Sequence, residues 1–260
     1  MFITLFALGL IGGILSGLLG VGGAIVMIPL LLYIPPILNL GTYDMKLVSG
    51  MVMTMVLFSS ITGLIIHKKN NYFAKELLIY LGIPSLIFSG SGSLISKYIS
   101  GSIQLLIFAL LATVTAALMI WPQSKKEENI NTVESNSSNL IKSKKLAIFG
   151  SSIIGILMGI VGAGGGFILI PLMTILLGIP IKFAIGGSLG IVFMSSITGF
   201  IGKFVTGQIP LTQSIFLVLG ALPGASLGSI ISHKLSPSVL KTLLMVLVIV
   251  IALRTWYQVI

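Results

Sequence analysis

The stretch LSGLLGVGG at residues 15–23 returns as LMGIVGAGG at residues 157–165, 142 positions later. Each copy lies near the middle of an apolar run longer than 30 residues, at 2–34 and at 146–179. Glycine destabilises a helix interior by about 1 kcal/mol relative to alanine, so three or four glycines within seven residues should interrupt a helix. We therefore predict that both runs are broken helices or tight helical hairpins.

The similarity between the two halves extends beyond the glycine clusters. The sequence IPL at 28–30 recurs at 170–172, and SSITG at 59–63 recurs unchanged at 195–199. Shared leucine and isoleucine mean little in an apolar chain, but shared glycine, proline, serine and threonine at a nearly constant offset are hard to obtain by chance. The pattern predicts an internal duplication.

Composition indicates that most of the surface faces lipid. Of the 260 residues 56% are hydrophobic and only 8% are charged, and the mean hydropathy is +1.16. Soluble domains carry roughly a quarter charged residues, whereas a membrane-spanning helix needs about 20 apolar residues. We predict an all-α polytopic membrane protein with four hydrophobic segments in each half. The eight apolar runs are 2–34, 47–66, 77–96, 102–121, 146–179, 183–202, 212–232 and 238–260.

One segment has the composition of a polar linker. Residues 123–145 read QSKKEENINTVESNSSNLIKSKK, without apolar periodicity. The chain carries 15 Lys plus Arg against 5 Asp plus Glu, a net charge of +10. We attribute this excess to the positive-inside rule rather than to nucleic-acid binding, so the lysine-rich linker should be cytoplasmic. The predicted organisation is an N-terminal membrane repeat at 1–121, a cytoplasmic linker at 122–145 and a C-terminal membrane repeat at 146–260.

The charge distribution leaves two topologies open. If each run crosses the membrane once, ten cations lie on the linker side and five on the other side. If the two long runs are hairpins, the split is eleven against four, and the two halves are inverted relative to each other. The positive-inside rule slightly favours the hairpins, and the linker is cytoplasmic in both cases.

The glycine clusters and the repeated SSITG form the candidate substrate site. Glycine permits positive φ and close approach of other groups, and a helix that starts after a break presents free N–H groups and a positive dipole end to an anion. The alternative explanations are close helix packing for the glycines and bonds to a carbonyl one turn back for the hydroxyls. The predicted substrate-binding residues are Gly20, Gly22, Gly23, Gly162, Gly164, Gly165, Gly166, Ser59, Ser60, Thr62, Ser195, Ser196 and Thr198.

Charged residues are nearly absent from the apolar runs and mostly flank them. Lys46 and Lys182 precede runs and Lys203 follows one; we expect these lysines to reach the membrane interface and to attract an anion along its entry route. No acidic side chain lies inside a run as a proton or sodium ligand. No nucleophile–base pair, metal-ligand cluster or nucleotide-binding loop is visible, so no catalytic or metal site is expected. Duplicated membrane chains with paired interrupted helices are typical of secondary transporters.

The doubled motif resembles that of a known family. GLLGVGG at 17–23 and GIVGAGGG at 159–166, each followed by IPL, resemble the TauE/SafE family of sulfite exporters, and the similarity runs from about residue 5 to 257. The longer connection at 39–42 and the long linker depart from the family pattern. The resemblance implies a multi-pass protein of the cytoplasmic (inner) membrane that moves sulfite, sulfonates or related anions without a cofactor.

The expected function is therefore secondary transport of a small sulfur-containing oxyanion, with an anion channel as the alternative. A membrane-embedded enzyme and a subunit of a larger complex rank lower. The expected partners are the anionic substrate and the lipid bilayer. The sequence leaves open the coupling ion (proton or sodium), the direction of transport and assembly as a homo-oligomer.

Overall fold

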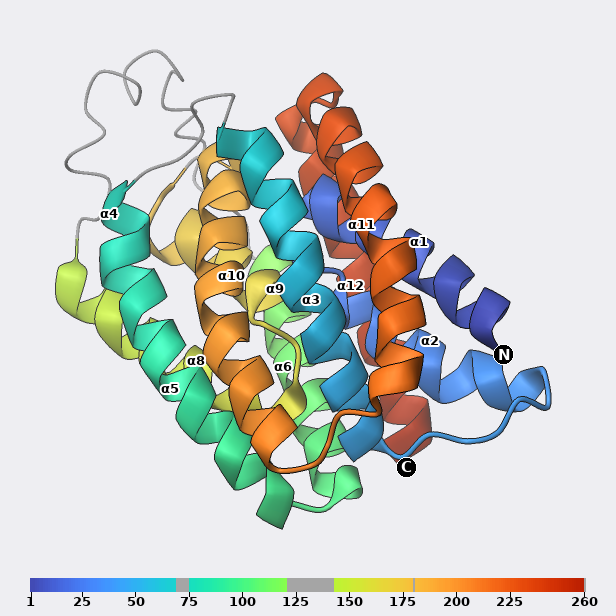
Figure 1. Ribbon diagram of the computed structural model, residues 1–260. Coiled ribbons are helices and arrows are strands. Elements are labelled where there is room, and N and C mark those ends of the chain that lie inside the picture. The colour runs from blue at the N-terminus through green and yellow to red at the C-terminus, as the bar shows by residue number, and fades with distance from the viewer. Residues whose placement is uncertain (69–74, 121–142, 180, 260) are drawn as a thin grey trace.

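The computed structural model describes residues 1–68, 75–120, 143–179 and 181–259, and within these ranges the protein is all-α (Figure 1). Eight helices there are long and apolar enough to cross a membrane. The first half contains α1 (Phe2–Leu19), α2 (Ala24–Ile37), α3 (Met45–Lys68), α4 (Lys75–Leu77), η1 (Leu78–Gly82), α5 (Ile83–Ile95), η2 (Ser96–Tyr98) and α6 (Gly101–Ile120). The second contains α8 (Lys144–Val161), α9 (Gly166–Pro171), η3 (Leu172–Leu176), α10 (Ile181–Val205), α11 (Leu211–Lys234) and α12 (Pro237–Val259). Most of the predicted linker lies outside the described residues, and α8 begins slightly before the predicted boundary.

The first long apolar run is a helical hairpin. α1 is followed by Gly20, and α2 begins at Ala24 and returns along α1. As a result Gly12 of α1 lies against both Gly23 and the side chain of Met27. The break predicted from the glycine cluster is therefore confirmed.

The second long run has the same shape. Gly165, just before α9, lies against Met158 and Ile154 of α8, and Gly150 nearer the start of α8 lies against Leu172. The contacts move back along α8 as the chain moves forward, so the two helices are antiparallel. The hairpin topology is thus the one adopted, and the alternative in which each run crosses once is wrong.

Proline lies next to both π-helical segments. η1 immediately precedes α5, which carries Pro84 in its first turn, and η3 immediately follows Pro171. A proline ring has no N–H to donate and clashes with the preceding turn, so the hydrogen-bond ladder must be rearranged there. The wider π turn accommodates this rearrangement.

Glycine-rich seams join the two halves. α1 packs along α11, where a Cβ on Gly13 would lie 2.3 Å from the backbone oxygen of Ala221 and one on Gly224 would lie 2.3 Å from that of Leu10. α5 packs along α8 through glycines as well. In the predicted duplication α1 corresponds to α8, and α11 corresponds to α5. The α1–α11 pair in one seam is therefore the counterpart of the α8–α5 pair in the other. The packing agrees with the duplication, which itself stays a prediction.

The central helices and the two ends of the bundle position the site. α3 and α10 lie side by side in the middle, with α1 and α2 on one flank and α5 and α8 on the other (Figure 1). The start of α3 and the end of α5 meet the segment after α10, where Gly50 and Ser96 both contact Gln208. α8 begins at the opposite end, where Lys144 lies 4.9 Å from the ring centroid of Tyr80. The helix that follows the linker therefore starts at the end opposite Gln208.

Candidate functional site

The two glycine turns adopt left-handed backbone conformations at matching positions. The angle φ lies between +65° and +93° at six of the predicted residues: Gly20, Gly22, Gly23, Gly162, Gly164 and Gly165. A side chain in this region costs roughly 1–2 kcal/mol, so the backbone geometry itself favours glycine at both turns. The seventh predicted glycine, Gly166, starts α9 instead.

The two turns meet in the interior of the bundle. A Cβ on Gly22 would lie 3.0 Å from Cγ1 of Val56 on α3 and 3.2 Å from Cγ1 of Val192 on α10. A Cβ on Gly164 would lie 2.6 Å and 3.2 Å from the same two atoms. Both valines are fully buried. Two turns that are far apart in the sequence therefore border one small region between α3 and α10.

Further backbone contacts lock the turns together. A Cβ on Gly166 would lie 2.6 Å from the Cα of Val21 in the first turn, so the two turns touch directly. Gly162 lies against the backbone of Ser49 on α3, and Gly20 lies against α10. Each turn thus rests on the central helix of the other half.

The first serine of each SSITG copy reaches a hairpin. Ser195 Oγ donates to the carbonyl of Gly164 at 2.9 Å. Ser59 Oγ lies 3.1 Å from Ser16 Oγ in the last turn of α1. Both hydroxyls are buried. Ser195 therefore contacts the second glycine turn and Ser59 contacts the helix that leads into the first, and their role in binding substrate stays a prediction.

The other predicted hydroxyls make helix contacts. Ser60 and Ser196 donate to carbonyls three residues back in their own helices, and Thr62 donates to the carbonyl four residues back. Thr198 donates to the carbonyl of Leu86 on α5. These four hydrogen bonds do not reach a glycine turn, and the proposed lining role of these residues stays a prediction.

Two glycines of the sequence clusters lie inside helices and not in the turns. A Cβ on Gly17 would lie 2.2 Å from the backbone oxygen of Ala225, and one on Gly159 would lie 2.2 Å from that of Ser89. At these two positions close helix packing, the alternative explanation from the sequence, accounts for the glycine.

Both returning helices begin where the turns meet. The first-turn N–H groups of a helix have no acceptor within the helix, and here they belong to α2 from Ala24 and to α9 from Gly166. All residues of the two turns are buried. Among the described residues the acidic ones are Asp44 and Glu76, and neither belongs to a turn. The two turns therefore offer N–H donors and positive helix-dipole ends, and their own residues include no carboxylate.

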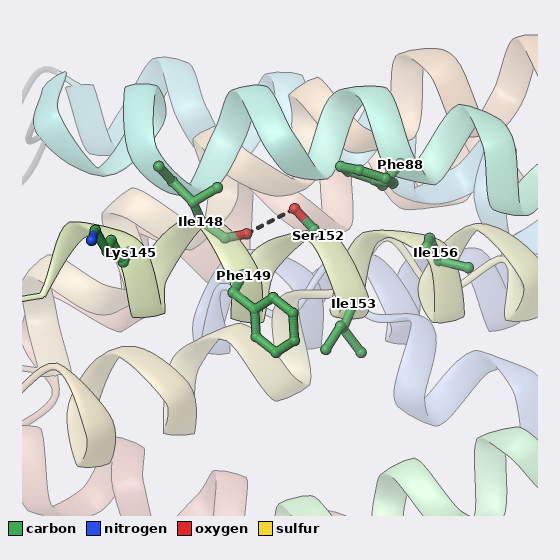
Figure 2. A pocket seen from close by; sticks show the side chains of 7 residues that line it. All are labelled: Phe88, Lys145, Ile148, Phe149, Ser152, Ile153 and Ile156. Atoms are coloured by element: carbon green, nitrogen blue, oxygen red, sulfur yellow. Dashed lines mark hydrogen bonds between the residues drawn. The ribbon is translucent and has the colours of Figure 1, made fainter.

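A groove on the outer face of α8 is a separate feature. Its cavity measures about 480 Å³ and is lined by Phe88, Lys145, Ile148, Phe149, Ser152, Ile153 and Ile156. Figure 2 shows that the hydroxyl of Ser152 is turned to the carbonyl of Ile148, to which it donates at 2.8 Å. The remaining lining is mostly hydrocarbon, which suits lipid chains. None of the predicted substrate-binding residues belongs to it.

The expectation for Lys203 was wrong. A lysine at the end of an apolar run was expected to reach the membrane interface, but the side chain of Lys203 is 0% exposed. Lys46 does remain partly exposed and donates to the carbonyl of Lys97 at 3.0 Å. The side chain of Lys182 lies outside the described part of the chain. Polar groups of separate elements accept hydrogen bonds from the buried Lys203 ammonium. No local sequence pattern indicates that these groups are its neighbours.

In the part of the chain that the structure describes, eight helices of membrane-spanning length and two interrupted hairpins that meet between the central helices define a multi-pass membrane protein. Residues 5–255 match the family model described as Sulfite exporter TauE/SafE, and the chain belongs to this family. A Bacillus subtilis protein named probable membrane transporter protein YunE is 27% identical over 99% of this chain and 98% of its own length. A probable membrane transporter protein of Methanocaldococcus jannaschii is 27% identical over 92% of this chain and 90% of its own. No solved structure matches significantly.

Proposed function

We propose that this protein is a secondary transporter that moves a small sulfur-containing oxyanion, such as sulfite or a sulfonate, across the cytoplasmic membrane. The observation that carries the proposal is the buried meeting of the two glycine turns against Val56 and Val192. The family description supports the sulfur chemistry, and the names of the relatives support transport.

The chemistry of the turns favours an anion. The starts of α2 and α9 supply N–H donors and positive dipole ends, each worth about 0.3–2 kcal/mol to a bound negative charge. The hydroxyls of Ser59 and Ser195 can turn from their present partners toward a ligand oxygen. A metal cation or a proton relay would need carboxylates, and neither of the acidic residues that the structure describes, Asp44 and Glu76, belongs to a turn. We infer binding and translocation here, without a catalytic step.

The arrangement of the hairpins supports alternating access. One hairpin comes from each half, and each packs on the central helix of the other half. A small movement of one hairpin against α3 and α10 would open the meeting point toward one membrane face while the seam on the other flank keeps it closed. The buried state of all turn residues corresponds to the closed intermediate of such a cycle.

An anion channel is the alternative, and the closed turns favour the transporter. Purified protein in liposomes should distinguish the two. Liposomes preloaded with unlabelled anion should accumulate labelled anion by counterflow, which a carrier produces and an open pore does not. We expect counterflow within a panel of sulfite, sulfate, thiosulfate, sulfoacetate and taurine. Rapid conductive flux without counterflow would favour the channel, and no movement of any of these compounds would contradict the proposal.

A further inference from the structure

A buried lysine, Lys203, lies at the end of the bundle opposite the start of α8. Lys203 Nζ donates to Ser49 Oγ at 2.9 Å, to Ser96 Oγ at 3.0 Å and to Gln208 Oε1 at 3.2 Å. It also lies 3.2 Å from the carbonyl oxygen of Ile160. These partners come from α3, η2, the segment after α10 and α8, so the ammonium joins four separate parts of the fold.

All the groups that accept hydrogen bonds from Lys203 are neutral. Two hydroxyls, one amide oxygen and one backbone carbonyl surround it, and the carboxylates of the described residues, those of Asp44 and Glu76, are not among them. Burying an ammonium group without a counter-charge is costly. Ionisable groups inside membrane proteins mark binding sites and transport pathways by default.

A line of buried hydroxyls connects this lysine to the middle of the bundle. It runs along α5 into the first residue of η2, and every serine of the line is fully or almost fully buried: Ser85, Ser89, Ser93 and Ser96. Ser89 Oγ has no hydrogen-bond partner although it is buried, and it lies 3.0 Å from where a Cβ of Gly199 would be. A buried hydroxyl without a partner costs desolvation free energy that no hydrogen bond offsets. The Ser89 hydroxyl is therefore free to donate to a ligand.

We propose that Lys203, Ser49, Ser96 and Gln208 form a second anion site, which binds the transported oxyanion at the end of the bundle opposite the linker. With the linker cytoplasmic, this is the outward-facing end. The inference rests on the proposed anion transport and identifies the cation that neutralises the substrate. From this site the buried hydroxyls of α5 continue along α10, where Ser93 lies against Gly202 and Ser89 against Gly199.

The groups around Lys203 can exchange their present partners for an anion. Ser49 Oγ now donates to the carbonyl of Lys46 and Ser96 Oγ to that of Ser93, and both hydroxyls can rotate. Gln208 Nε2 lies 3.0 Å from Ser96 Oγ and is a further donor. A pyramidal or tetrahedral oxyanion would accept hydrogen bonds from these groups and from the ammonium, and charge-assisted bonds of this kind are the strong ones.

The site also contacts the second hairpin. Ile160 lies in the last turn of α8, and Gly162, which follows it, rests on the backbone of Ser49. An anion that binds the Lys203 ammonium would replace its hydrogen bonds to Ile160 and Ser49. α8 and α3 would then lose a polar connection next to the second turn. Binding at the outer end would thereby free the hairpin that borders the central region.

One substitution that adds a negative charge tests whether the Lys203 cluster binds an anion or only stabilises the fold. Gln208→Glu puts a carboxylate beside the ammonium, which should preserve or strengthen the cluster but compete with the substrate anion. Binding of sulfite and sulfoacetate to purified protein is measured by calorimetry, and folding by the midpoint of thermal unfolding. We expect affinity to fall about tenfold or more, with an unfolding midpoint at or above that of the wild type. Gln208→Met is the matched neutral change and should lose less affinity.

Substitutions of the lysine complete the test. Lys203→Met should lose as much affinity as Gln208→Glu, Lys203→Arg should retain part of it, and Lys97→Met, an exposed cation at the same end, should bind like the wild type. If Lys203→Met does not fold, Gln208→Glu decides, because it adds a counter-charge. Wild-type affinity in a folded Gln208→Glu protein would overturn the second site alone. Absence of anion binding by the wild type would overturn the proposed function itself, and this site with it.

Discussion

Gly22 and Gly164 lie 142 positions apart in the chain, yet both border the side chains of Val56 and Val192. Each glycine has a positive φ in a turn between two antiparallel helices, and each turn rests on the central helix of the other half. The relationship explains why the motif occurs twice: two equivalent turns are needed to enclose one region from opposite sides.

Enlarging either glycine should abolish transport. Gly22→Val and Gly164→Val place branched side chains against Val56, because even a Cβ would lie 3.0 Å and 2.6 Å from its Cγ1 atom. We expect inserted protein with anion uptake reduced about tenfold or more, measured in liposomes at equal protein density. Gly178→Val is the control, because Gly178 has a φ of +70° but no atom within 4 Å of its Cβ position. Wild-type uptake in both turn variants would mean that the clusters only pack helices.

The paired serines should contribute equivalent donors. Ser59→Ala and Ser195→Ala each remove a hydroxyl next to a hairpin, and a hydrogen bond of this kind contributes about 0.5–1.5 kcal/mol. The double variant should therefore weaken anion binding more than either single one. Ser60→Ala with Ser196→Ala is the comparison, and we expect a smaller loss, because the hydrogen bonds of these hydroxyls stay within their own helices and do not reach a hairpin. Equal affinities for the Ser59 and Ser60 pairs would count against a lining role.

Single cysteines should report the orientation, because the chain contains none of its own. Ser137→Cys in the linker and Ser236→Cys between α11 and α12 should resist an impermeant thiol reagent in intact cells and react after lysis. Thr42→Cys, before α3, should react in intact cells. If Ser236→Cys and Thr42→Cys both react in intact cells, the long runs 2–34 and 146–179 would each cross the membrane once. Labelling of Ser137→Cys in intact cells would reverse the orientation.

The α1–α11 seam should tolerate no added carbon. A Cβ on Gly13 would lie 2.3 Å from the backbone oxygen of Ala221, which cannot move as a side chain can. Gly13→Ala should therefore cost about 1–3 kcal/mol of stability, seen as a lower unfolding midpoint. Gly150→Ala in α8 is the control, because the atom nearest to its added Cβ would be the end of the flexible Leu172 side chain, at 3.1 Å. An unchanged midpoint for Gly13→Ala would show that this seam is loose.

The sequence sufficed where local chemistry decides the structure. Glycines at 20–23 and 162–166 interrupt helices because helix propensity fails there and the turns need positive φ, both of which are properties of the residues themselves. The choice between hairpins and single crossings was only weakly indicated by charge. It became definite through contacts such as that of Gly12 with Met27, which depend on the fold.

The sequence did not indicate features that depend on distant residues. Lys203 was expected at the interface, and its burial depends on Ser49, Ser96 and Gln208, which lie in separate elements. Gly17 and Gly159 belong to the same sequence clusters as the turn glycines, but they lie one turn earlier, where they pack on α11 and α5. Neither distinction is visible without knowing which helices are neighbours.

The central claim is that the meeting point of the glycine turns selects negative charge, and calorimetry on purified protein tests it most directly. Sulfite, sulfoacetate and the organic cation choline are titrated into wild-type protein and into Gly164→Val protein. We predict that at least one of the two anions binds to the wild type, that the variant loses the part of this binding that the glycine turns supply, and that choline binds to neither protein. Tighter binding of choline than of both anions would contradict the account.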